Sequence, residues 1–395
     1  MRSGTTRRDF LRMMGATAGV AVGATLPGIP PKAAAATSPS PGNPDRRPLG
    51  KTGFQVGTVG FGAMTTRDPE VIRFAVERGV DYVDTADCYM GGENERIVGR
   101  ALAGIRDKVV LATKVHIAPV DQMIRSAENS LRSLKVDVID VLQLHGISTE
   151  AEVTDERARE AIRKLIDQGK VRAAGVTTHR GQETVLRAVR KHGFYKTALV
   201  AYNFRSDTGV AATVAGALGL SQGLSNTIRA VAESGIGVIA MKTQAGGYAS
   251  PPGGFSPHQA ALAWVLANPG VVTTIPGMTS YAQVEENLGA RDKRFALADR
   301  IALGRYALEI GDRHCGLCGA CGGACPRGVE IPNVLRALTY LEGYREEGLA
   351  RSTYVALPPG RNASACGDCG VCLVACRLRL PVGRLGRRAH ARLAG

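Results

Sequence analysis

The sequence predicts a closed (β/α)8 barrel followed by a small, mostly helical, cysteine-rich domain. Short β-branched runs alternate with amphipathic segments eight times between residues 49 and 291. That number of repeats and that length are typical of the closed barrel. Eight of the nine cysteines fall in two clusters beyond this region. A doubly wound open sheet is the alternative, but no GxGxxG pattern follows the first run, which weakens it.

The eight runs are mostly apolar along their length, as strands buried on both faces should be. The intervening segments, such as "DPEVIRFAVERG" and "QMIRSAENSLRSLK", are apolar at helical spacing. We therefore expect strands at 56–64, 81–86, 109–115, 138–145, 171–177, 198–203, 236–242 and 271–277.

The N-terminus resembles a twin-arginine export signal. Arg7 and Arg8 precede Phe10 and a moderately apolar stretch, and a small-residue cleavage site follows at Ala34–Ala36. A disordered basic tail or a short membrane helix are the alternatives, although the stretch is short and rich in glycine for a spanning helix. The signal predicts export to the periplasm or cell envelope through the twin-arginine machinery, which carries folded proteins.

The chain divides by composition into four parts: a signal at 1–36, a linker at 37–46, the barrel at 47–295 and the helical domain at 296–395. The net charge of +15 suggests nucleic-acid binding at first. Most of that charge comes from both termini, including six arginines in 377–395, and the middle of the chain is unremarkable. We therefore expect no nucleic-acid partner, and an arginine-rich tail that is solvated or faces an acidic redox partner.

Four polar residues follow three consecutive predicted strands. They are Asp84 and Tyr89, Lys114, and His145. Each alone has an ordinary structural explanation: a helix cap, a rim charge or a core histidine. Because barrel chemistry lies at the carboxyl ends of the strands, the set predicts one proton-transfer site. The nearby Cys88 is interpreted as a buried small residue.

The two cysteine clusters predict iron–sulfur centres. The first has the spacing C-x2-C-x2-C-x3-C-P of bacterial four-iron ferredoxins, and the second has Arg377 in place of the proline. Structural zinc sites, the alternative, usually space their C-x2-C pairs further apart. By analogy with two-cluster ferredoxins, the fourth cysteine of each run is expected to bind the other cluster. One set is then Cys315, Cys318, Cys321 and Cys376, and the other is Cys366, Cys369, Cys372 and Cys325. The segment 329–350 between them is expected to be one helix with its cap.

The barrel region resembles the aldo/keto reductases over residues 47–290. "LGKTGFQVGTVGFGAM" resembles their opening, and "DTADCYMGGENERIVGRAL", "TKV" and "LQLHG" resemble their catalytic segments in the family's order. The resemblance implies a tetrad of Asp84, Tyr89, Lys114 and His145 that acts on a small carbonyl-type substrate. Tyr89 would donate the proton, with Lys114 lowering its pKa.

The family's cofactor-binding positions are less well matched. "AAGVTTH" and "TTIPGMTSYAQVEENL" resemble the segments that hold NADPH. Thr177, Thr178 and Leu199 replace the family's nicotinamide ligands, and Met241, followed by Lys242, replaces the stacking tyrosine. Gly277, Met278 and Gln283 replace its phosphate ligands. The resemblance implies cofactor contacts from Thr177, Thr178, Asn203, Lys242, Gly277, Met278, Glu286 and Asn287. Because charged phosphate contacts are missing, we expect weak NADPH binding.

Together these observations predict an exported oxidoreductase that takes electrons from NADPH or from two 4Fe–4S clusters. Two rival hypotheses remain. The first is an electron-transfer protein whose barrel is only a binding scaffold. The second is a cytoplasmic reductase whose clusters are purely structural.

Overall fold

The computed structural model describes residues 46–206, 223–246, 256–291, 293–311, 313–317, 319–367 and 369–395. Its main feature is an eight-stranded sheet with the order β10-β9-β8-β7-β6-β5-β4-β3, in which all neighbours are parallel. Parallel bridges join Val59 to Thr274 and Gly62 to Gly277, so the two edges of the sheet meet. The predicted closed barrel is therefore confirmed, and the open sheet is excluded.

The strands of the barrel are buried almost throughout, which explains their apolar composition. They are β3 (Phe61–Gly62), β4 (Tyr82–Asp84), β5 (Val110–Val115), β6 (Ile139–Leu144), β7 (Val171–Thr178), β8 (Thr197–Ala201), β9 (Gly237–Met241) and β10 (Val271–Thr274).

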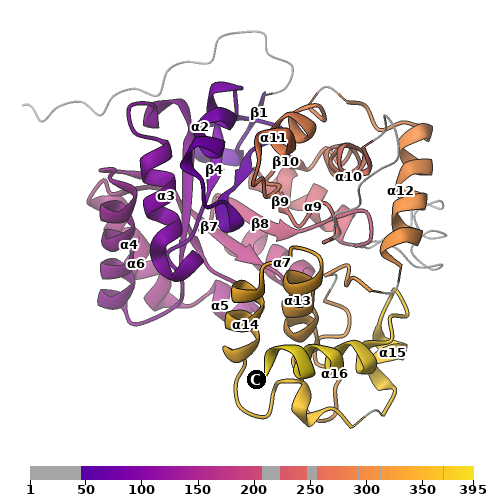
Figure 1. Cartoon of the computed structure of the whole chain (residues 1–395). Helices are drawn as coiled ribbons and strands as arrows, with labels where there is room; N and C mark the ends of the chain where they lie inside the picture. The colour runs from indigo at the N-terminus through magenta and orange to yellow at the C-terminus, as the bar shows by residue number, and fades with distance from the viewer. Residues whose placement is uncertain are drawn as a thin grey trace, which may run out of the picture. The chain divides into compact units, whose positions relative to one another are not determined.

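Helices surround the barrel, as Figure 1 shows, and their apolar faces form one core with the outer face of the sheet. Several begin at caps that the sequence supplies. Asp68 accepts a hydrogen bond from the Glu70 amide ahead of α2, and Thr149 and Glu152 form a capping box. These helices are α2 (Pro69–Glu77), α3 (Glu93–Ala101), α4 (Val120–Leu134), α5 (Glu150–Val153), α6 (Glu156–Asp167), α7 (Gln182–His192), α9 (Leu224–Glu233), α10 (Pro257–Leu266) and α11 (Tyr281–Leu288).

The first predicted strand is wrong in its extent. Residues 56–64 divide between β2 (Gln55–Gly57), the short β3 and a following 3-10 turn. β2 pairs antiparallel with β1 (Arg46–Pro48) in a separate hairpin. Leu49 and Val56 of this hairpin region belong to the cluster of apolar side chains inside the barrel.

The C-terminal region forms a helical module with an apolar core of its own. It contains α13 (Ile331–Glu342), α14 (Glu347–Val355), α15 (Val371–Ala375) and α16 (Val382–Leu393). The single helix expected over 329–350 is therefore wrong. The chain breaks after α13 at Gly343, and Arg345 takes a positive φ of 58° before α14. A further helix, α12 (Leu297–Ile310), precedes the module and packs on α10 of the barrel.

The module contacts the barrel through its first cysteine loop. Leu317 is 4% exposed and belongs to the apolar cluster inside the barrel. Its carbonyl accepts a hydrogen bond from Gln182 Nε2 at 2.7 Å. Asn203, just after β8, donates to the Gly316 carbonyl at 3.2 Å, and the Arg205 guanidinium donates to the His314 carbonyl at 2.8 Å. The loop thus covers the carboxyl ends of the strands, where a barrel enzyme has its site.

Three predictions lie outside the described residues: the export signal at 1–36, all but the last residue of the linker, and Cys318. Within the described part of the chain, no helix is both long enough and apolar enough to cross a membrane.

Candidate active site

The four predicted catalytic residues lie together at the carboxyl ends of three adjacent strands. Asp84 is the last residue of β4, Lys114 is in β5, and His145 follows β6. Tyr89 begins a short 3-10 turn beyond β4, in which Met90, Gly91 and Gly92 all have positive φ. That unusual backbone places the Tyr89 ring beside Lys114 and His145.

Asp84 and Lys114 form a buried ion pair. Their side chains are 3% and 1% exposed, and Lys114 Nζ lies 2.5 Å from Asp84 Oδ1. Lys114 also donates to the Thr85 carbonyl at 2.5 Å. Burial raises the pKa of Asp84, and the Lys114 ammonium opposes that rise.

Gln143 also binds the Asp84 carboxylate, and the sequence analysis did not predict this contact. Its amide donates to Asp84 Oδ2 at 2.8 Å. A signal was present in the sequence: Gln143 lies between Val141 and His145 at alternating positions of one strand, and such positions share a face.

Tyr89 differs from the sequence-based expectation. Lys114 Nζ lies 4.7 Å from the centre of the Tyr89 ring, with its hydrogen bonds directed to Asp84 and Thr85. Burial raises the pKa of Tyr89 well above 10, and the nearby Asp84 carboxylate raises it further. Tyr89 is therefore protonated across the physiological pH range, whereas the resemblance implied a lowered pKa.

His145 is held as a neutral imidazole. Its ring centre lies 5.8 Å from that of Tyr89 in an edge-on arrangement. Burial lowers its pKa well below 6.5, and Lys114 and His116 lower it further. Its Nδ1 lies 3.5 Å from Cys88 Sγ. The interpretation of Cys88 as a buried residue is wrong, because its side chain is exposed.

The residues implied to bind NADPH are mostly engaged within the protein. Thr177 Oγ1 accepts from the Gly146 amide at 2.7 Å, and Thr178 Oγ1 donates to the Arg180 carbonyl at 2.7 Å. Asn203 also donates to the Lys242 carbonyl at 3.2 Å. Met278 is completely buried in the core between sheet and helices.

The remaining members of that set have mixed environments. Glu286 accepts from Ser256, and Asn287 Oδ1 accepts from Gln244 Nε2 at 2.7 Å. Gly277 and Lys242 line a pocket of about 60 Å³ at the barrel mouth, together with Asp84, Tyr89, His179 and Tyr344.

The C-terminal module contributes residues to this mouth that sequence reasoning missed. Lys242 Nζ lies 4.7 Å from the centre of the Tyr340 ring and 5.1 Å from that of Tyr344. Burial alone would raise the pKa of Tyr340, but the Lys242 ammonium and the Arg336 guanidinium outweigh it, so that pKa is lowered. Arg336 and Tyr340 lie four residues apart on one side of α13, and Tyr344 lies just beyond the end of that helix. Nothing in this local pattern indicates that they face Lys242.

The described cysteines of the module gather in two places. Cys325, Cys366, Cys369 and Cys372 line a cavity of about 230 Å³. Burial raises the pKa of Cys372, and the neighbouring cysteines 366, 369 and 325 raise it further. Cys321 and Cys376 are both buried in the module core, and Cys315 packs against that core.

The comparisons define the class of protein. A model of the aldo/keto reductase family matches residues 55–251 and 248–300, which is more than half of the chain. The chain therefore belongs to the aldo/keto reductase family, and it is an oxidoreductase. The match ends before α13, so the helical module lies outside it.

Individual relatives agree with this placement. The chain is 27% identical over 325 residues to "Probable aldo-keto reductase 1" of Glycine max, covering 67% of this chain and 89% of that protein. It is 40% identical over 108 residues to methylglyoxal reductase YeaE of Escherichia coli, covering 27% and 37% of the two chains.

Solved structures share the barrel. A holo aldo-keto reductase from Bacillus halodurans matches with a TM-score of 0.53 and 24% identity, over 66% of this chain and 95% of that one. An aldo-keto reductase from Klebsiella pneumoniae in complex with NADPH matches with a TM-score of 0.50 and 26% identity, over 64% and 91%.

Proposed function

We propose that this oxidoreductase interconverts a small carbonyl compound and its alcohol at the barrel mouth, with Tyr89 as the proton donor. The observation that carries the proposal is the buried Asp84–Lys114 pair with Tyr89 and His145 beside it at the same mouth. The three strand ends hold these groups on rigid elements, which suits a site that must position a small substrate.

The residues divide the proton chemistry between them. The neutral His145 imidazole can orient the carbonyl oxygen without competing for its proton. Tyr89 stays protonated and gives its hydroxyl proton to the oxygen as negative charge develops there. Without a hydride donor, reduction of one carbonyl also takes two electrons, one from each of the two proposed clusters, and a second proton from solvent for the carbon. Lys114 stabilises the phenolate that remains, because its ammonium lies against the ring. A positioned acid of this kind contributes on the order of 10²–10⁴ in rate.

The described residues do not fit a bound NADPH in this arrangement. The polar atoms of Thr177, Thr178 and Asn203 already have partners within the protein. The pocket beside Lys242 and Tyr344 is about 60 Å³, whereas ligand pockets are usually ~300–1,000 Å³. The NADPH complex of the relative from Klebsiella pneumoniae supports the cofactor as a family property only.

The cysteines of the module fit an iron–sulfur protein better. We propose two 4Fe–4S clusters, one held by Cys366, Cys369, Cys372 and Cys325 and the other by Cys315, Cys318, Cys321 and Cys376. Support for the first set is the 230 Å³ cavity that its four cysteines line together, which matches the crosswise pattern of two-cluster ferredoxins. When bound, such clusters transfer single electrons. We propose that a redox partner protein exchanges these electrons with the module.

Export by the twin-arginine route remains our proposal for residues 1–36. It is supported by Arg7 and Arg8 ahead of the apolar stretch. Fractionation of cells that express the protein tests it: replacing both arginines with Lys should retain the protein in the cytoplasm. An unchanged distribution would reject the signal.

The reaction is tested with cluster-loaded protein, reduced without oxygen and mixed with small aldehydes and ketones. We expect alcohol formation that Tyr89→Phe lowers by about 10²-fold or more while iron content is unchanged. Tyr340→Phe is the matched comparison, since Tyr340 is a buried phenol of the module beside Lys242. A larger loss of alcohol formation in Tyr340→Phe than in Tyr89→Phe would assign the role of proton donor to Tyr340 of the module instead.

The electron source is tested separately. Cys369→Ser should abolish electron supply through the clusters. Micromolar NADPH binding with hydride transfer that survives this change would reject the cluster-fed reaction. If Tyr89→Phe leaves cellular function intact and Cys369→Ser abolishes it, the barrel is a scaffold and the protein serves electron transfer.

A further inference from the structure

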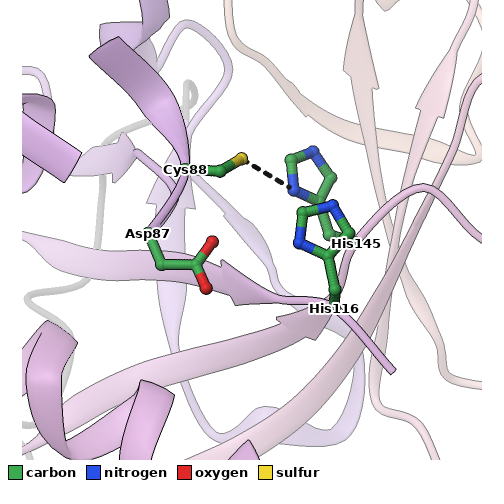
Figure 2. Close-up of side chains that lie close together, drawn as sticks. All are labelled: Asp87, Cys88, His116 and His145. Atoms are coloured by element: carbon green, nitrogen blue, oxygen red, sulfur yellow. Dashed lines mark hydrogen bonds between the residues drawn. The ribbon is translucent and has the colours of Figure 1, made fainter. Parts of the chain in front are cut away.

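Four potential metal ligands lie together on the rim of the barrel, apart from the cysteine module. Asp87 and Cys88 follow β4, His116 follows β5 and His145 follows β6. Each offers one ligand atom, and these atoms all lie within 4.8 Å of one another. Figure 2 shows the Asp87 carboxylate and the Cys88 thiol facing the two imidazoles across a small gap.

One distance in the group is that of a tetrahedral ion. Cys88 Sγ lies 3.5 Å from His145 Nδ1. A tetrahedral Zn²⁺ with Zn–S of about 2.3 Å and Zn–N of about 2.0–2.1 Å separates its sulfur and nitrogen ligands by about 3.5 Å. The His116 and His145 rings lie with their centres 4.7 Å apart, so both imidazoles reach the same gap.

A second observation points to a missing cation. Asp87 Oδ1 is buried and accepts no hydrogen bond from any described residue. Lys114, the ammonium that acts on Asp87 from β5, already donates hydrogen bonds to Asp84 and Thr85. The Cys88–His145 contact accounts for those two side chains, and His116 acts electrostatically on the Asp87 carboxylate, but neither gives Asp87 Oδ1 a hydrogen bond.

The backbone holds the ligand-bearing segments against one another. The Asp87 amide donates to the Lys114 carbonyl at 3.3 Å, and the His145 amide donates to the Val115 carbonyl at 2.9 Å. Segments fixed in this way to parallel strands provide the precision that a metal site requires. Cys88 and His116 are exposed, so an ion can enter from solvent.

We propose that Asp87, Cys88, His116 and His145 bind one divalent transition-metal ion. The donor set is one thiolate, two imidazoles and one carboxylate, and it favours Zn²⁺ in tetrahedral coordination. This assignment does not depend on the proposed carbonyl chemistry. It has one consequence for His145: coordination through Nδ1 requires the proton of the neutral ring to be on Nε2, which makes that edge a hydrogen-bond donor.

The test uses cluster-loaded protein, Zn²⁺ as the probe, and an element-specific measurement that iron does not obscure. After gel filtration we expect one zinc per chain by mass spectrometry. Zinc X-ray absorption should then give one sulfur at about 2.3 Å and three nitrogen or oxygen ligands at about 2.0–2.1 Å. A shell of three or four sulfurs would place zinc on the module's cysteines and overturn the assignment.

Variants of the two exposed ligands complete the test. Cys88→Ser and His116→Ala should each weaken zinc binding at least ~100-fold in competition with a chelator, since even outer-shell changes cost 10–100-fold. His192→Ala is the matched control, because among the described residues His192 bonds to the exposed Glu150, far from the four ligands in sequence. Unchanged iron content shows that each variant is folded. Zinc affinity that survives both ligand changes would refute the site.

Discussion

Replacing Asp84 with asparagine would leave the Lys114 ammonium buried without its counter-charge. Asn has nearly the shape of Asp, so the Gln143 contact and the packing can persist while the charge is lost. Both charged groups are at most 3% exposed, and their atoms lie 2.5 Å apart. Removing one partner of such a buried pair costs about 3–5 kcal/mol of unfolding free energy. The large cost arises because water cannot reach the ammonium that remains.

Urea unfolding of wild-type and variant protein with matched iron content, followed by far-ultraviolet circular dichroism, measures the effect. Glu160→Gln is the control: its bridge to Lys164 joins side chains that are about half exposed, and its loss should cost at most about 0.5 kcal/mol. The double variant Asp84→Asn with Lys114→Met removes the stranded charge and should recover most of the stability. A loss below about 1 kcal/mol for Asp84→Asn, or no recovery in the double variant, would refute the assumption that the pair is desolvated.

Three further predictions concern the mouth and the module. Because the pKa of Tyr89 is raised, kcat/KM for the proposed carbonyl reduction should show no loss from ionisation of Tyr89 until the pH exceeds 10. A fall between pH 7 and 9 that Tyr89→Phe abolishes would contradict this. Gly343→Ala should lower the opening free energy of α13, measured by hydrogen exchange, by about 1–3 kcal/mol, because the added Cβ would lie 1.9 Å from the Gly246 carbonyl oxygen. Gly348→Ala is the control: it has open space around it and should stabilise α14 slightly. Lys242→Met should raise the pKa of Tyr340 in a spectrophotometric titration, and an unchanged value would show that the ammonium does not act on that phenol.

The sequence was most informative where chemistry follows regular structure. Asp84, Lys114 and His145 could be placed at one site because consecutive parallel strands end at the same edge of a barrel. Gln143 supports Asp84 from the same strand face, and only the alternation of β6 indicated it. The environment of Tyr89 could not be predicted, because its raised pKa depends on how completely the mouth is covered.

The residues of the module that cover the barrel mouth reach it through long-range packing, which the local sequence pattern does not indicate. Arg336 and Tyr340 belong to an ordinary-looking amphipathic helix, and nothing in their neighbours in sequence directs them to Lys242. The break between α13 and α14 has a similar cause. Gly343 lies against the backbone of Gly246, and this contact between distant segments coincides with the end of the helix.

Leu317 changes how the two parts of the chain should be regarded. It lies in the loop that carries Cys315, yet its side chain belongs to the apolar lining of the barrel with Leu199, Met241 and Ile275. A chain ending at residue 300 would lack that side chain and would open this lining to water. The module and the barrel are therefore not independent, because a side chain of the module forms part of the barrel's apolar interior. A form shortened to end before Leu317 therefore lacks part of the barrel's apolar core as well as the cysteines.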